Sequence, residues 1–340
     1  MEHSVSSFGD YPSKVDDLLA YPGARPQGSF LLSQDIVTEL PDDFDDFKDA
    51  ADQALARADQ PLIGERIPIL AYGANANPPR AVAKMEKYGL DGERLMMPFA
   101  SVDVPDAAAV WHGRPGQGGS IFAELYKGDE VEGGALQTHL SFVTEEQAAV
   151  IHASEGATYS LVELEAQMKG RRQLGHRALA YVGLDATVLL KDGAPLGVAG
   201  LSNDVPLEAM TAEEAVNYIL EQGDVAEIAG ATNARELVEQ GISFKLPEKK
   251  YRQAMIGVRL AELGISRAYR YPARQTEFVG RLAFGAQKNR HPEYAESGAQ
   301  FIEISGLGLG DLRDPKGKRL MDVLNGRAVT ELEIGMRNAE

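Results

Sequence analysis

The stretch IPILAYGANANPPRAVAKMEKYG (67–89) decides the fold prediction, because it contains a strand, a tight loop and a helix in direct succession. The apolar run IPILAY (67–72) has the length of a buried strand and stops at Gly73. Asn77 is the predicted N-cap of the helix, and the two prolines after it suit a first helical turn. Gly89 is the predicted C′ residue.

The loop between this strand and helix is a candidate binding site. A strand that ends at a glycine before a helix N-terminus exposes backbone N–H groups, which suit a carboxylate or a carbonyl that develops negative charge. Ala74 and Ala76 are small enough for a ligand to approach the backbone, and Asn75 adds an amide. An ordinary turn between a strand and a helix has the same composition, so the loop alone leaves both interpretations open.

Further strands are predicted after the helix. The candidates are 94–104, 108–113, 119–128 and 135–143, separated by glycine-rich turns. Such a series indicates a meander or a barrel. Thr144 and Gln147 then form a capping box that predicts a helix over 145–154, and 159–165 alternates as another strand.

The rest of the chain has weaker signals. Strands are expected over 178–202 with a hairpin at Asp192–Gly193, and helices over 211–220, 232–240 and 247–264. Residues 1–60 have apolar spacings of three and four and are predicted as a helical N-terminal extension. The sequence thus predicts a central domain over 61–245 and an α-rich C-terminal extension over 246–340.

Glu155 is the candidate acid/base residue. It stands between the end of a predicted helix and the next strand. The negative end of the helix dipole is unfavourable for a carboxylate at this position. If it is partly buried at a cleft, its pKa is raised, which suits proton transfer near neutral pH. An exposed glutamate beside a C′ glycine is the alternative for this residue.

Together the two segments resemble the γ-glutamylcyclotransferase-like family. The family's loop is typically Tyr-Gly-Ser-Asn-Leu, and its later element reads roughly Leu-Asp-x-x-Glu-Gly with a tyrosine after it. This chain has YGANA (72–76), then IHASEG (151–156), then Tyr159. The resemblance covers 67–165 and extends to 206–223. Three positions depart from the family pattern: Ala74 replaces serine, Ala76 replaces leucine and His152 replaces aspartate.

The resemblance implies an α+β fold, with a small mixed β-barrel or sheet and flanking helices. It also implies an enzyme that cyclises a γ-glutamyl compound to 5-oxoproline and releases an amine or amino acid. Glu155 would be the general acid/base, and neither metal nor cofactor is required. The implied substrate-binding residues are Tyr72, Gly73, Ala74, Asn75, Ala76 and Tyr159.

Composition limits the other function classes. The chain has 340 residues and a net charge of −17, which disfavours nucleic acid as a partner. It contains no cysteine, so thiolate nucleophiles, disulfides and cysteine-based metal sites are excluded. No secretory signal and no run of about 20 apolar residues is present, so a cytoplasmic protein with no membrane partner is expected.

Two other functions stay open at this point. The same fold could bind a small molecule without turnover, or it could transfer an amide or acyl group on a related substrate. The glycine run GLGLGD (306–311) lacks the spacing of a dinucleotide-binding loop, and the histidines lack zinc-ligand spacing. The sequence leaves the substrate and the oligomeric state undefined.

Overall fold

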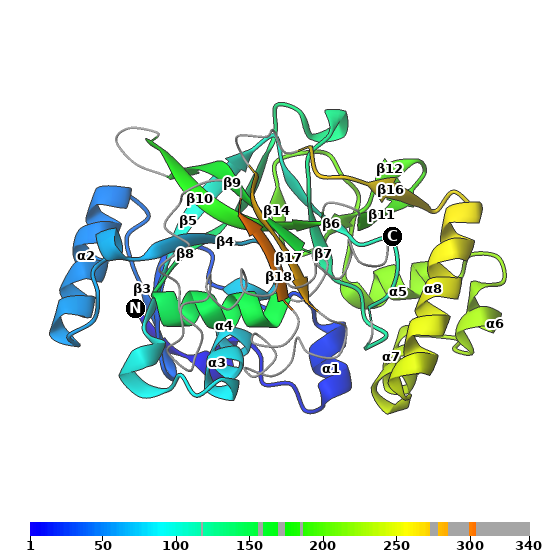
Figure 1. Cartoon of the computed structure of the whole chain (residues 1–340), viewed down its shortest axis with the longest axis horizontal. Helices are drawn as coiled ribbons and strands as arrows, with labels where there is room; N and C mark the ends of the chain where they lie inside the picture. Colours follow the sequence, from blue (N-terminus) through cyan, green and yellow to red (C-terminus); the bar gives the residue numbers. More distant parts are fainter. Residues whose placement is uncertain are drawn as a thin grey trace, which may run out of the picture.

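Five strands close into a small barrel at the centre of the protein (Figure 1). The computed structural model describes residues 1–303 apart from 117, 156–158, 169–173, 184–185, 273–277 and 285–298. The order of the barrel strands is β5-β8-β4-β10-β9, and β9 pairs with β5 to close the barrel. The strands are β4 (Ile67–Ala71), β5 (Met97–Pro105), β8 (Ala135–Val143), β9 (Tyr159–Met168) and β10 (Leu174–Gly183). Strands β4 and β10 run parallel, and the other pairs are antiparallel. The predicted α+β fold with a small mixed barrel is therefore confirmed.

Alternating side chains divide the strands between two apolar cores. Leu70 of β4 and Leu140 of β8 belong to one buried cluster, whereas Ile69 of β4 and Val143 of β8 belong to another. Successive residues of a strand point to opposite faces, so one short strand contributes to both cores. The second core includes Met85 of α3 (Pro78–Lys87) and residues of α4 (Glu145–Glu155), which cover one side of the sheet (Figure 1).

The first 60 residues contribute strands as well as helices. Strands β1 (Glu2–Ser4), β2 (Phe30–Ser33) and β3 (Ile36–Glu39) extend the barrel sheet through the pairing of β2 with β5. The helices are η1 (Val5–Phe8), α1 (Lys14–Leu19) and α2 (Phe44–Arg57). The helical prediction for this region is correct for α1 and α2 and wrong for the strands. The reason is that FLLS is a four-residue apolar run, whose length and pattern do not distinguish strand from helix.

Two smaller sheets lie beside the barrel. One contains β6 (Ala108–Trp111), β7 (Ala123–Tyr126), β13 (Gly197–Val198) and β15 (Ala209–Met210), and the other contains β11 (Ala186–Lys191), β12 (Ala194–Pro195) and β16 (Ser266–Tyr269). The remaining strands are β14 (Ser202–Asn203), which pairs with β8, β17 (Phe278–Phe284), which pairs with β9, and β18 (Ala299–Glu303). Short 3-10 turns are η2 (Ile63–Glu65), η3 (Ala74–Ala76), η4 (Gly92–Leu95) and η5 (Asp129–Val131). The predicted hairpin is confirmed, because Asp192 and Gly193 have φ angles of 51° and 83° between β11 and β12.

Four helices gather at one end of the molecule (Figure 1): α5 (Ala212–Leu220), α6 (Val225–Ala229), α7 (Ala234–Ser243) and α8 (Leu246–Glu262). Helix α5 lies within the predicted range 211–220, and Thr211 and Glu214 form a capping box at its start. Helix α7 continues past the predicted end at residue 240. Gly241 lies within the helix against the backbone of Gly118, where an added Cβ would be 2.4 Å from a carbonyl carbon. That glycine therefore serves a close approach and not a helix stop.

The C-terminal part of the chain is described only in pieces. Of the predicted α-rich extension over 246–340, the structure describes α8 and the strands β16, β17 and β18. The glycine run 306–311 lies outside the described residues. The division into domains at 61 and 246 stays a prediction. In the described part of the chain, no helix has the length and apolar character needed to cross a bilayer.

Candidate functional site

The loop that follows β4 has the predicted strand–loop–helix form. Strand β4 ends at Ala71, η3 forms one tight turn, and Asn77 caps α3 by accepting a hydrogen bond from the Arg80 N–H at 3.1 Å. The prolines that follow Asn77 occupy the first turn of α3, where the missing N–H groups have no helical partner to lose. Local sequence signals therefore account for the end of the strand, the cap and the first turn of this helix.

Two of the predicted binding residues are part of the core. Tyr72 is buried, and its hydroxyl donates to the Tyr181 carbonyl at 2.8 Å. Ala76 is fully buried, and its N–H donates to the Gly73 carbonyl at 3.3 Å within the turn. A ligand in contact with this loop thus meets Gly73, Ala74 and Asn75, which are half-buried, and not Tyr72 or Ala76.

Asn75 lines a small cavity between the barrel, α3 and α4. The walls include Lys84 of α3, Ser141 of β8 and Ile151 of α4. The Lys84 ammonium donates to Asn75 Oδ1 at 2.6 Å, and the Ser141 hydroxyl donates to the Ile69 carbonyl at 2.8 Å. The cavity is about 10 Å³, near the lower limit for one water molecule. It therefore joins an amide, an ammonium and a hydroxyl in a space that a larger ligand would have to open.

Glu155 is the last residue of α4, one helical turn after Ile151. Its side chain, like that of His152, lies outside the described residues, as does Gly156. The structure therefore brings the backbone of Glu155 close to the cavity wall through the helix that also carries Ile151. The predicted cleft setting and raised pKa of Glu155 stay predictions.

Tyr159 begins β9 and is half-buried. Its backbone pairs with Gly183 of β10, and its ring packs against the core beneath α3 and α4. Tyr159 is not among the residues that line the Asn75 cavity. Asn75 and α4 thus line the same cavity, and Tyr159 lies outside its lining.

A segment of the N-terminal region covers the other side of the loop. The Asn77 amide donates to the carbonyl oxygens of Phe8 and Ala24, and Asn77 is 1% exposed. The Tyr21 hydroxyl accepts a hydrogen bond from the Ala123 N–H at 3.2 Å and stands next to Gly73. Residues 8–24, to which the sequence assigned no role at the site, therefore form one of its walls.

The sequence interpretation missed Lys84 as a part of the site. Lys84 follows Asn77 by seven residues, which is two helical turns. Positions two turns apart share a helix face, so the spacing could have indicated that Lys84 lies on the same side of the helix as Asn77 and the loop. Asn77 was identified as a cap, but its second role depends on residues more than 50 positions away, for which no local pattern exists.

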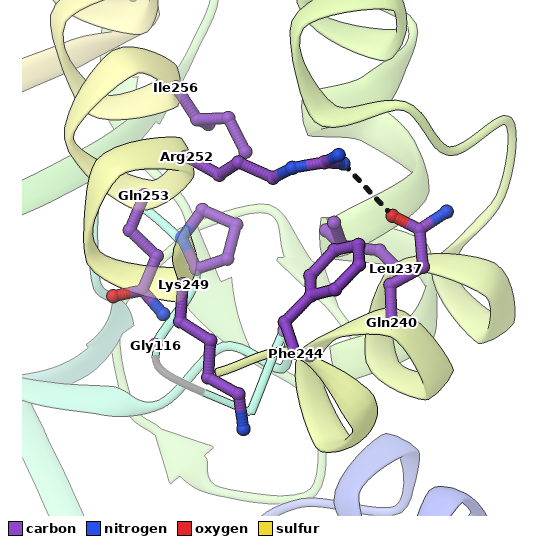
Figure 2. A pocket seen from close by; sticks show the side chains of 11 residues that line it. Gly116, Leu237, Gln240, Phe244, Lys249, Arg252, Gln253 and Ile256 are labelled. Carbon is purple, nitrogen blue, oxygen red and sulfur yellow. Dashed lines mark hydrogen bonds between the residues drawn. The ribbon is translucent and has the colours of Figure 1, made fainter. Parts of the chain in front are cut away.

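A second hollow lies between α7 and α8 (Figure 2). The Arg252 guanidinium stacks 4.5 Å from the centre of the Phe244 ring and donates to Gln240 Oε1 at 3.2 Å. The remaining space is about 30 Å³, enough for a few water molecules only. These contacts join the two helices.

No cluster of three or more potential metal ligands occurs among the residues that the structure describes. Comparison with known protein families, curated proteins and solved structures finds no match to this chain. The site therefore has to be interpreted from its own geometry.

Proposed function

We propose that the chain is a γ-glutamylcyclotransferase-like enzyme that acts at the Asn75 cavity. The observation that carries the proposal is that Asn75 of the loop and Ile151 of α4 line the same space, with Glu155 one turn after Ile151. The loop and the helix are the two segments on which the sequence resemblance rests, and they lie about 75 positions apart. Their meeting at one cavity supports a common site.

The proposed reaction takes place within one substrate molecule. The α-amine attacks the γ-carbonyl carbon, a new N–C bond closes the five-membered ring, and the former amide C–N bond breaks. The ammonium nitrogen loses two protons as it becomes the lactam nitrogen. Glu155 accepts one of them and passes it to the leaving nitrogen, and the other goes to solvent or to the released amine. Attack within one molecule has a high effective concentration, which leaves proton transfer and charge stabilisation to the protein.

The polar groups of the cavity suit the remaining tasks. The Lys84 ammonium is a cation for the α-carboxylate of a γ-glutamyl group, and the Asn75 amide is a donor for the oxygen that becomes negative in the transition state. Because the Ala76 N–H already donates to Gly73, we assign this donor role to Asn75 and not to the backbone of Ala76. The substitutions Ala74 and Ala76 leave these groups in place.

The small volume of the cavity sets a condition for this function. A γ-glutamyl group is far larger than one water molecule, so the Lys84 side chain and the last turn of α4 have to move when substrate binds. Exchange of the Lys84–Asn75 hydrogen bond for contacts with the substrate would provide part of that opening. A substrate-bound structure is expected to show α4 displaced from the loop.

The test is release of 5-oxoproline from a panel of γ-glutamyl amino acids and amines. We expect Glu155→Gln to lower kcat at least 100-fold, because the amide retains the shape and loses the base. The matched control is Glu145→Gln, an exposed glutamate in the first turn of the same helix, which should leave the rate unchanged. Equal rates for wild type and Glu155→Gln would remove Glu155 from this role.

A second function, binding without turnover, is favoured by one observation. Tyr72 and Ala76 are held in the core, so two residues on which the resemblance relies do not face a ligand, whereas Asn75 and Lys84 still line the cavity. No 5-oxoproline from any member of the panel would support this alternative. Products other than 5-oxoproline, detected by mass spectrometry of the same reactions, would instead support amide or acyl transfer.

A further inference from the structure

Arg25 lies at the junction of two surface hollows that flank the segment between α1 and β2. Both hollows are lined by Arg25 and Gln27, and their volumes are about 490 and 520 Å³. Small-ligand pockets typically have volumes of about 300–1,000 Å³, so each is large enough for a metabolite. Neither shares a lining residue with the Asn75 cavity.

The Arg25 guanidinium has weak and neutral partners. Its Nη1 donates to Thr138 Oγ1 at 3.3 Å, and its Nη2 donates to the Gln137 carbonyl at 3.4 Å. Ordinary N–H···O bonds are about 2.9–3.0 Å long, so both are near the limit. Within the described part of the chain, no carboxylate approaches this guanidinium within 4 Å, whereas several other arginines form such pairs.

Arg25 is half-buried, and its partial desolvation makes this arrangement costly for the protein. Desolvation lowers the pKa of Arg25 to about 10, so the group keeps its charge at neutral pH in surroundings that disfavour it. A charge removed from water is destabilising unless it is paired and hydrogen-bonded. An anion with two oxygens would satisfy the planar donor groups that Thr138 and Gln137 hold only weakly.

The two hollows differ in charge. The larger one contains Glu39 and Asp42, whose oxygens accept from His3 and from the Ser29 N–H. The smaller one has a single carboxylate, the exposed Glu213, and its side chains other than Glu213 and Arg25 are neutral. An anion bound to Arg25 meets fewer carboxylates in the smaller hollow than in the larger one. The smaller hollow is therefore the better binding site for an anion.

We propose that Arg25 holds the carboxylate of a small monocarboxylate ligand in the hollow bounded by Tyr21, Ala199 and Glu213. The paired oxygens of a carboxylate match the fork of the guanidinium, and the mainly apolar walls suit a short carbon chain. A single negative charge fits the one cation, whereas further charge meets Glu213. This site does not depend on the proposed cyclisation, because it shares no lining residue with the Asn75 cavity.

The test uses the full chain with butyrate and with butyramide, which has the same shape without the charge. We expect saturation-transfer NMR to give a Kd on the order of 1 mM for butyrate, a modest efficiency for six heavy atoms. Butyramide should show no saturable signal. Equal binding of both, no binding of butyrate, or tighter binding of inorganic phosphate would overturn the proposal.

Variants locate the binding. Arg25→Gln should weaken butyrate binding at least tenfold, and the exposed control Arg57→Gln should not change it. Glu213→Gln should strengthen binding about twofold to threefold, because it removes the repelling charge. If thermal unfolding shows that Arg25→Gln is not folded, Ala199→Leu provides the second test, since it narrows the hollow and keeps the arginine. Unchanged affinity in a folded Arg25→Gln or in Ala199→Leu would overturn the assignment.

Discussion

The Tyr21 hydroxyl occupies the space that a side chain at Gly73 would need. A Cβ atom added to Gly73 would lie 2.6 Å from that oxygen, a distance too short for van der Waals contact. Tyr21 is held by the Ala123 N–H and packs against Trp111, with ring centres 5.9 Å apart. The glycine of the loop is thus required by the N-terminal segment that covers it, in addition to any role in binding.

Gly73→Ala should therefore destabilise the protein by about 1–3 kcal/mol, because Tyr21 has to move out of its packed position. The control is Gly64→Ala, where an added Cβ meets nothing within 4 Å. Chemical denaturation of both variants measures the difference. Equal stability of the two would contradict the packing of Tyr21 on the loop.

Asn77→Ala should destabilise the protein by about 2–4 kcal/mol. The change removes the cap of α3 and leaves the carbonyl oxygens of Phe8 and Ala24 without this donor at a part-buried position. Asn233→Ala is the matched control, since Asn233 caps α7 at an exposed position and should cost only about 1 kcal/mol. Urea unfolding of the two variants should separate them clearly, and similar losses would mean that Asn77 acts as a cap alone.

Stability should fall as the pH rises from about 10 to about 12. Burial raises the pKa of Tyr126 to about 12, and its hydroxyl donates to Glu130 Oε2 at 2.6 Å. Above pH 10 a tyrosine in the unfolded chain loses its proton while Tyr126 in the folded protein retains it, so the unfolded state gains relative stability. The contribution is about 1–3 kcal/mol.

Tyr126→Phe should flatten the pH dependence of unfolding in that interval. The comparison variant is Tyr251→Phe, because Tyr251 is 68% exposed. Unfolding free energies at pH 8, 10 and 11.5 would show the change in slope. A slope that Tyr126→Phe leaves as steep as in the wild type would assign the pH dependence to other groups.

Local signals predicted much of the barrel and of the loop. The run IPILA, the cap at Asn77 and the helix after it, and the Thr144–Gln147 box all act within a few residues, and each has the predicted form. Those features depend on propensity and capping, which sequence carries directly.

Local signals could not predict the contacts of the N-terminal segment that lies over the loop. Arg25 meets Thr138 at a separation of 113 positions, and Tyr21 meets Ala123 at a separation of 102. Nothing in the composition of 19–29 indicates that it lies over the end of β4. The strands β2 and β3 were missed for a related reason. They are too short for their sequence to distinguish strand from helix, and what makes them strands is the pairing of β2 with β5 and of β3 with β2.

The parallel pairing of β4 with β10 also has a consequence for how the chain acquires its structure. Ile69 pairs with Leu179, 110 positions later (179 − 69 = 110). Pairing over such a separation closes a large loop before its contacts form, which slows folding. During synthesis the barrel cannot close until β10 has left the ribosome. Until then, part of the apolar surface of β4 and β8 stays exposed. Slow folding and a need for chaperone protection of the nascent chain are the expected result.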